Sequence, residues 1–159
     1  MTIKRFNPKA IDESGKFVRD TVTNLVWHRV QTRPLYADTD RSQVVYHANY
    51  LRYFELGRAS LMRDMGYPYR EVENAGFIYP VVDLQISFKN PLFYDDPIWI
   101  HTRPAEIDRI RVTFNYLITQ VEHGCLVCTG FTKHCALNEK RKPTSVDATT
   151  VRLWKTFPA

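Results

Sequence analysis

The stretch Tyr36–Glu55, YADTDRSQVVYHANYLRYFE, joins a polar turn to the start of a long helix. Before it, the chain alternates apolar and other residues from Leu25 onward, which is typical of a strand with one buried face. Pro34 cannot donate to a sheet ladder, so this strand is expected to bend or to lie at an edge there. The pattern predicts a strand that ends near Asp40, followed at once by a turn.

Helical spacing begins at about His47 or Asn49 and continues to Gly66. Gly66 and the proline two residues later are typical of a helix end. Gly57 lies in the middle of this segment, where glycine costs about 1 kcal/mol in helix propensity relative to alanine. We therefore expect a sheet surface to approach this helix closely at Gly57.

Arg58 falls on the apolar side of this helix, and Glu55 lies on the flank three residues earlier. A buried guanidinium needs a carboxylate nearby, so a structural pair between the two is the favoured interpretation. A catalytic Glu55 is the alternative.

The rest of the chain predicts four long strands joined by short turns, hence antiparallel neighbours. Residues 1–22 are polar and show no clear periodicity, so they are interpreted as an N-terminal arm, ordered against a partner if at all. Residues 23–159 are predicted to form a single domain that ends in a helix within 144–159. The fold class is α+β: a curved antiparallel sheet of about five strands wrapped around one long central helix.

Composition limits the classes of function. The net charge is +5 and the isoelectric point about 9.2, which favours an anionic partner such as a nucleotide-bearing group. The basic residues are scattered and accompany no helix-turn-helix, zinc or RNP-like pattern, so nucleic acid is not expected. No segment has the roughly 20 apolar residues of a membrane helix, and the N-terminus does not resemble a secretory signal. We expect a cytoplasmic protein.

Three cysteines, Cys125, Cys128 and Cys135, invite a metal or redox interpretation. In a strand, the first and last would lie about 33 Å apart and Cys128 would face the opposite side from both. One metal ion cannot collect them, so buried, inert thiols and no metal site are predicted.

The opening stretch, Y-x-D-T-D-x-x-x-V-V-Y-H-A-N-Y-L-R-Y-F-E, resembles the signature of the 4-hydroxybenzoyl-CoA thioesterase-like family. The later stretch ISFKNPLFYDDPIWI, from Ile86 to Ile100, resembles the second strand, proline-containing turn and third strand of that family. The resemblance covers roughly residues 26–143 and implies a hotdog fold and an acyl-CoA thioesterase without a cofactor. Family members assemble as dimers and often tetramers, so a homo-oligomer, with a tetramer as our estimate, is expected.

The resemblance also implies the site. Asp40 matches the catalytic aspartate, as nucleophile or general base; His47 and Tyr36 match further catalytic positions. Relatives often carry glycine where this chain has Ser42 and Gln43, which leaves the shape of the loop and the choice of acyl group open.

The chemistry suits these positions, because the first turn of a helix offers unpaired N–H groups to a thioester carbonyl. The backbone at Tyr46 and His47 is the expected oxyanion site. The expected substrate contacts are Tyr46, Asn49 and Tyr50, while Asp38 is expected to serve the turn. For the nucleotide part of CoA the candidates are Lys89, Arg109, Arg111 and Lys133.

Two alternatives remain open at this point. The first is a hotdog-fold dehydratase or hydratase acting on acyl thioesters; the second is a non-catalytic acyl-CoA-binding protein. The acyl group, and CoA against acyl-carrier protein as its carrier, are also open.

Overall fold

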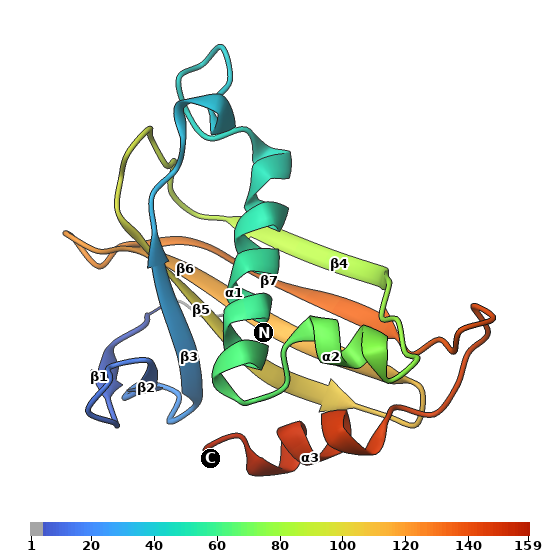
Figure 1. The fold of residues 1–159 in the computed structure, drawn as a ribbon. Helices are drawn as coiled ribbons and strands as arrows, with labels where there is room; N and C mark the ends of the chain where they lie inside the picture. Colours follow the sequence, from blue (N-terminus) through green and yellow to red (C-terminus); the bar gives the residue numbers. More distant parts are fainter. Residues whose placement is uncertain (1–4) are drawn as a thin grey trace.

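A seven-stranded antiparallel sheet curves around one long helix in the computed structural model, which describes residues 5–159 (Figure 1). The strand order is β1-β2-β3-β5-β6-β7-β4, so the strands at the two edges are β1 and β4. The strands are β1 (Pro8–Ala10), β2 (Phe17–Asp20), β3 (Val26–Thr32), β4 (Val81–Phe88), β5 (Ile98–Ile107), β6 (Arg111–Gln120) and β7 (Leu126–Cys135). The central helix is α1 (Tyr50–Asp64), and the shorter helices are α2 (Tyr69–Asn74) and α3 (Ala148–Thr156).

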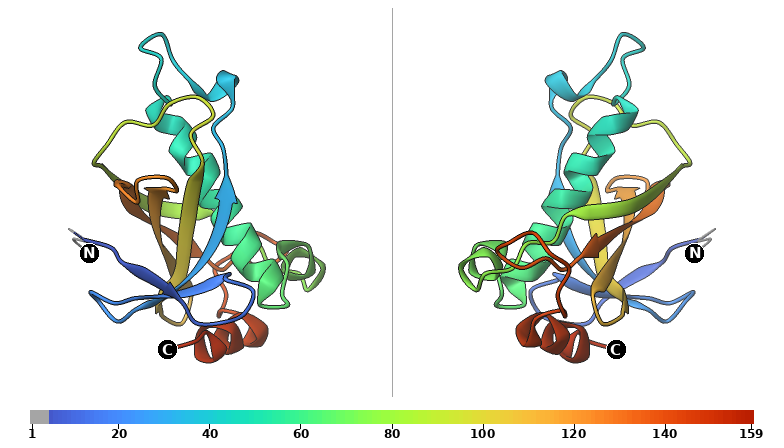
Figure 2. Two further views of the ribbon diagram at one scale, coloured as in Figure 1. Left: turned by 90° about the vertical axis from the view of Figure 1, so that its left-hand side faces the viewer. Right: turned by 90° about the vertical axis from the view of Figure 1, so that its right-hand side faces the viewer.

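Helix α1 lies against one face of the sheet because alternate strand residues offer it an apolar surface. Phe54 stacks on Tyr116 of β6, with ring centroids 4.3 Å apart and planes 5° apart. A Cβ atom at Gly57 would overlap the Thr102 hydroxyl and stand 2.7 Å from Cγ2 of Ile100. The expected close approach of the sheet at Gly57 is confirmed. The predicted helix and the sheet wrapped around it are confirmed as well (Figure 2).

The N-terminal segment differs from the expected arm. The described part of residues 1–22 contributes β1 and β2, which extend the sheet beyond β3 and bring it from about five strands to seven. Phe6 packs edge-on against Trp27 and His101 on the face of the sheet away from α1, with centroid distances of 6.1 and 4.6 Å. Residues 1–4 lie outside the described part of the chain. Strands of three and four residues are too short to show a period, so their structure depends on pairing, of β2 with β3 and of β1 with β2.

The C-terminal helix α3 closes one end of the sheet, as the sequence predicts for residues 144–159 (Figure 1). Asp147 caps it by accepting from the amide of Thr150 at 3.0 Å and from its hydroxyl at 2.7 Å. Asp147 also accepts from the hydroxyls of Tyr67 and Tyr79, at 2.9 and 2.6 Å. These bonds tie α3 to the segment on either side of α2.

Strand β3 ends at Thr32, two residues before Pro34, rather than near Asp40. From there the chain forms a loop that projects beyond the sheet before α1 begins (Figure 1). Within residues 5–159, no helix has the length and apolar composition needed to cross a membrane.

Candidate active site

Asp38 organises the loop between β3 and α1. Its side chain is only 2% exposed. One carboxylate oxygen accepts from the amide of Leu35 at 2.9 Å and from the hydroxyl of Tyr53 at 2.8 Å; the other accepts from Arg52 at 2.6 Å. Its backbone oxygen accepts from the side-chain amide of Asn49 at 2.8 Å. One residue thus ties the loop to the first turn of α1.

The ionised form of Asp38 is the favoured one. Burial alone would raise the pKa of this carboxyl, but the hydrogen bonds from Leu35 and Tyr53 and the charge of Arg52 outweigh burial and lower it. Burial and the adjacent carboxylate raise the pKa of the Tyr53 hydroxyl, which therefore stays protonated and donates. Asp38 serves the turn, as expected, but it does so from inside the molecule.

Asp40 is the first residue of a tight turn that ends at Gln43 and Val44. Its amide donates to the carbonyl of Val44 and its carbonyl accepts from the amide of Gln43, both at 2.9 Å. One carboxylate oxygen accepts from the amide of Ser42 at 2.7 Å, and the side chain is half-buried. Among the hydrogen bonds within residues 5–159, none uses the second carboxylate oxygen of Asp40. That oxygen can act on a substrate or a water molecule.

Gln43 adopts a φ of +66°, in the left-handed region that favours glycine. Glycine would avoid the steric cost of this conformation, whereas this chain adopts it with a long polar side chain. The departure at Gln43 therefore changes what the loop presents to a ligand.

The start of α1 offers fewer free amides than expected. A short 3₁₀ turn, His47–Asn49, precedes the α-helix. The amide of Tyr46 donates to the backbone oxygen of Asp38 at 2.9 Å, so it is not available to a substrate, which corrects the expectation for Tyr46. No hydrogen bond among the described residues uses the amides of His47 and Ala48, and these two remain as oxyanion donors.

A groove of about 220 Å³ opens beside these amides. His47 and Tyr50 line it from the helix side, and Lys89 and Asn90 line it from the segment that follows β4. Tyr50 is 3% exposed and its ring packs edge-on against Phe88, with centroids 5.1 Å apart. The remaining lining residues are Val44, Val45, Phe88 and Pro91.

The predicted site residues are brought together only in part. His47 and Tyr50 share the groove, and the ring of Tyr46 lies 4.2 Å from that of His47. Asp40 does not itself line the groove, although its amide donates to Val44, which does. Within residues 5–159, no hydrogen bond joins Asp40 to His47. Tyr36 is 78% exposed and its ring meets Tyr94 at 5.9 Å.

Asn49 holds the loop through Asp38 rather than facing the groove. A different asparagine, Asn90, was not among the predicted site residues but lines the groove, and its side chain donates to the carbonyl of Leu126 at 2.7 Å. Its signal was its place beside Pro91, in the second stretch that carries the family resemblance.

Of the four basic candidates for nucleotide binding, only Lys89 lines the groove. The amide of Lys89 donates to Val127, at the start of β7, whereas Lys133 lies six residues further along that strand. A strand rises about 3.3 Å per residue, so the two lysines are about 20 Å apart. Arg111 lies opposite Cys135 of β7, two residues beyond Lys133, and so at the same distant end of the sheet.

The cysteines do not gather. Within the described residues, no three His, Cys, Asp or Glu side chains are placed to hold a metal ion. Cys128 is fully buried, and burial raises the pKa of its thiol to about 12. Cys125 and Cys135 are half-buried, so the expectation of three buried thiols holds for Cys128 only.

This chain is similar in sequence and structure to known thioesterases. The Thioesterase-like superfamily matches residues 34–152. The Bacillus subtilis protein YneP, whose name proposes an acyl-CoA thioesterase, is 33% identical over 123 residues, which span 77% of this chain and 84% of YneP. The crystal structure of a DHNA-CoA thioesterase from Staphylococcus aureus superimposes with a TM-score of 0.77 at 29% identity, over 81% of this chain and 89% of that one. A 4-hydroxybenzoyl-CoA thioesterase in complex with 4-hydroxybenzoyl-CoA has the same fold, with a TM-score of 0.72 at 20% identity, over 80% of this chain and 97% of that one.

The chain belongs to the thioesterase-like superfamily and has the hotdog fold. It is a thioester hydrolase. The family resemblance and the fold inferred from the sequence are both confirmed.

Proposed function

We propose that this protein hydrolyses acyl-CoA thioesters, with Asp40 as the catalytic carboxylate at the groove lined by His47 and Tyr50. The observation that carries the proposal is the turn around Asp40. It leaves one carboxylate oxygen of Asp40 without a hydrogen-bond partner among the described residues, and Val44, to which the amide of Asp40 donates, lines the groove together with His47. The names of the relatives support acyl-CoA as the substrate class.

Two routes use the same groups. As a general base, Asp40 takes a proton from water while the water oxygen bonds to the carbonyl carbon; the C–S bond then breaks, and Asp40 returns the proton to the leaving sulfur, so that CoA leaves as the thiol. As a nucleophile, Asp40 itself bonds to the carbonyl carbon, the thiolate leaves, and water hydrolyses the resulting anhydride. Both routes place negative charge on the carbonyl oxygen.

The amides of His47 and Ala48 are the proposed donors to that oxygen. They open the helical segment, where partial positive charge adds to their hydrogen bonds. The imidazole of His47, at the edge of the groove, orients the thioester or the water. Tyr46 and Tyr50 contribute aromatic surface for the acyl group, and Lys89 is the proposed contact for the anionic end of CoA. Tyr36 lies on the outer side of the loop, so its proposed contact is with a substrate that extends past Asp40.

A second copy of the chain is the proposed partner at β4. This edge strand pairs on one side only, with β7. Its exposed apolar side chains are Val81 (45%), Val82 (54%), Leu84 (43%) and Phe88 (51%). An open, apolar strand edge pairs readily with another strand. Because Phe88 also lines the groove, a second copy at β4 would help to enclose the substrate.

The test measures release of free thiol from short-chain, long-chain and aromatic acyl-CoAs by the wild type and by Asp40→Asn. Removing a general base or nucleophile should lower kcat about 10²- to 10⁴-fold. Glu122→Gln, an exposed charge in the turn after β6, is the matched control and should keep wild-type kcat. Thermal unfolding of each variant reports whether the fold is intact.

Absence of thiol release from every substrate would contradict the hydrolase proposal, and tight acyl-CoA binding without turnover would favour the binding alternative. Equal kcat in Asp40→Asn and wild type would remove Asp40 from the mechanism.

A further inference from the structure

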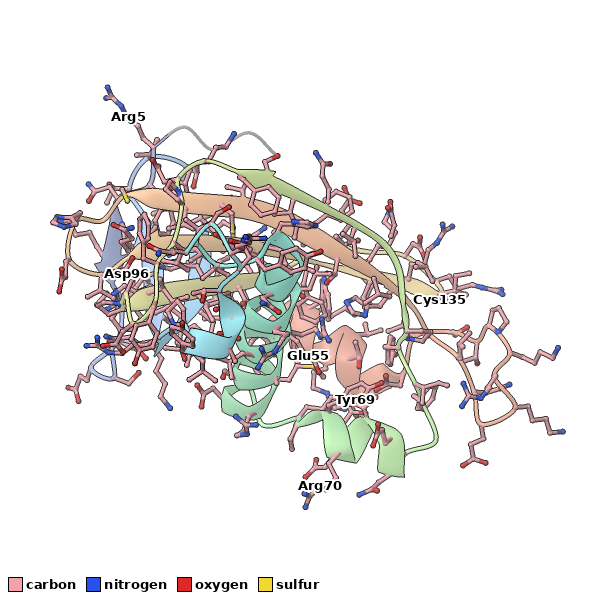
Figure 3. The ribbon with its side chains drawn as sticks, turned by 90° about the horizontal axis from the view of Figure 1, so that it is seen from above. Arg5, Glu55, Tyr69, Arg70, Asp96 and Cys135 are labelled. Atoms are coloured by element: carbon pink, nitrogen blue, oxygen red, sulfur yellow. The ribbon has the colours of Figure 1, made fainter. Side chains whose placement is uncertain are left out.

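A second cavity, of about 170 Å³, lies at the C-terminal half of α1, away from the groove beside His47. Glu55, Arg58 and Ala59 line it from α1, and aromatic rings of Tyr69, Phe114 and Trp154 line it from α2, β6 and α3. Figure 3 shows the labelled Glu55 and Tyr69 close to one another beside α1. The hydrolytic reaction proposed above uses none of these residues.

Arg58 begins a directed chain of hydrogen bonds beneath this cavity. His134 Nδ1 lies 2.9 Å from the carbonyl of Tyr79, which can only accept, so this nitrogen carries the proton. Burial, reinforced by the charge of Arg58, lowers the pKa of His134 to about 4. The imidazole is therefore neutral at pH 7, and its Nε2 accepts.

The directions of the remaining bonds follow from this assignment. Thr132 donates to His134 Nε2 at 2.8 Å, Tyr116 donates to the Thr132 hydroxyl at 2.7 Å, and Arg58 Nη1 donates to the Tyr116 hydroxyl at 3.2 Å. Every acceptor in this series of hydrogen bonds is a neutral group. The network therefore positions the guanidinium of Arg58 without neutralising it.

The expected pair between Glu55 and Arg58 does not form. No carboxylate within residues 5–159 makes an ion pair with Arg58. Glu55 is exposed, whereas Arg58 is half-buried. A guanidinium has five N–H donors, and the network engages only Nη1. The cavity therefore contains a cation whose other donors are free to bind an anion.

We propose that this cavity binds a small aromatic carboxylate, with the carboxylate on Arg58 and the ring among Tyr69, Phe114 and Trp154. An apolar protein cavity of about 150 Å³ holds benzene, so the volume here admits one substituted ring. Arginine and carboxylate match each other geometrically through two parallel hydrogen bonds. Such a ligand supplies the counter-charge that the chain does not.

Glu55 should oppose the binding of an anion in this cavity. Its carboxylate lines the same cavity from the exposed side and repels an anionic ligand. Replacing it by an isosteric neutral residue should therefore strengthen binding, the opposite of the effect expected at Arg58.

The test is calorimetric titration of the full-length protein with sodium benzoate, and with benzamide as the neutral analogue of the same shape. We expect benzoate to bind with a Kd of about 1 mM or tighter. It should bind about tenfold more tightly than benzamide, because a charge-assisted pair is roughly twice as strong as a neutral hydrogen bond. The NMR signal of the Trp154 indole N–H should shift with benzoate.

Arg58→Met should weaken benzoate binding about tenfold or more, whereas Glu55→Gln should tighten it. Ala59→Leu keeps Arg58 but fills the cavity, so it should abolish benzoate binding. It provides a second test in case Arg58→Met folds poorly. Arg63→Met removes the same charge from an exposed position on α1 outside this cavity and should bind as the wild type does.

No benzoate binding to the wild type, equal affinity for benzoate and benzamide, or unchanged affinity in Ala59→Leu would each overturn the proposal. Asp40→Asn should bind benzoate with wild-type affinity. A failure of the hydrolase proposal can therefore be distinguished from a failure of the benzoate-binding proposal.

Discussion

At the scale of single residues, Asp38 and Asp40 stand two positions apart and have opposite environments. Asp38 is buried and bonded to Leu35, Arg52 and Tyr53, whereas Asp40 is half-buried and bonded only to the Ser42 amide through its side chain. The first carboxylate holds the loop, and the second is left available for chemistry. A substitution at each should therefore affect a different property.

Asp38→Asn should destabilise the protein by about 2 kcal/mol, since one donor or more will face an amide NH₂ instead of a carboxylate oxygen. The measurement is urea unfolding at pH 7, compared with Glu73→Gln, an exposed carboxylate on α2 that should stay within about 0.5 kcal/mol of the wild type. A fully stable Asp38→Asn variant would show that the loop does not depend on this carboxylate.

His134 should make the stability depend on pH. Its pKa falls from an ordinary 6.5 to about 4 in the folded protein, so the unfolded chain binds the proton first as the pH is lowered. Stability is therefore complete above about pH 6.5 and is lost as the pH falls toward 4, by about 2 kcal/mol at pH 5.

The measurement is the free energy of unfolding in urea at pH 7 and pH 5, for the wild type and for His134→Gln. The variant retains a donor and an acceptor but does not titrate, so its loss between the two pH values should be smaller by about 2 kcal/mol. Equal losses in both proteins would refute this role for His134.

Among the secondary-structure elements, the close contact between α1 and β5 limits which side chains position 57 can carry. Gly57→Ala gains about 1 kcal/mol in helix propensity, but its Cβ would overlap Thr102 and crowd Ile100. Overpacking of this kind typically costs about 1–3 kcal/mol, so we expect a net loss of stability. Thermal unfolding measures it, with Leu56→Ala, on the exposed side of the same helix, as the nearly neutral control. A more stable Gly57→Ala protein would mean that the helix can move away from the sheet.

The periodicity of the sequence was sufficient for α1 and the long strands, because their residues face one side consistently. It was insufficient for β1 and β2, whose three and four residues pair with β3 and with one another. It also placed the end of β3 too late, because the polar residues after Pro34 form a loop held by Asp38 instead of continuing the strand.

For the molecule as a whole, the proposed pairing with a second copy depends on the open edge at β4. A charge at Leu84, in the middle of that strand, should prevent a second copy from pairing there. Leu84→Arg is expected to sediment as a smaller species than the wild type in analytical ultracentrifugation. Val22→Arg places the same charge on an exposed apolar residue beside β2 and should leave the assembly unchanged. Identical sedimentation of Leu84→Arg and wild type would rule out the β4 edge as the interface.

The fold class and the family follow from local patterns along the chain: a periodicity, a turn and a short signature from Tyr36 to Glu55. Asp40 could be singled out for the same reason. The neighbours of each charged side chain, in contrast, depend on how distant segments pack against one another. Packing brings Asp38 to partners 14 and 15 residues away and separates Lys89 from Lys133 along the sheet. It also leaves Arg58 without an ion pair to Glu55, although both residues line the same cavity. Such contacts arise from strand register and helix packing, which bring together residues that no local pattern relates.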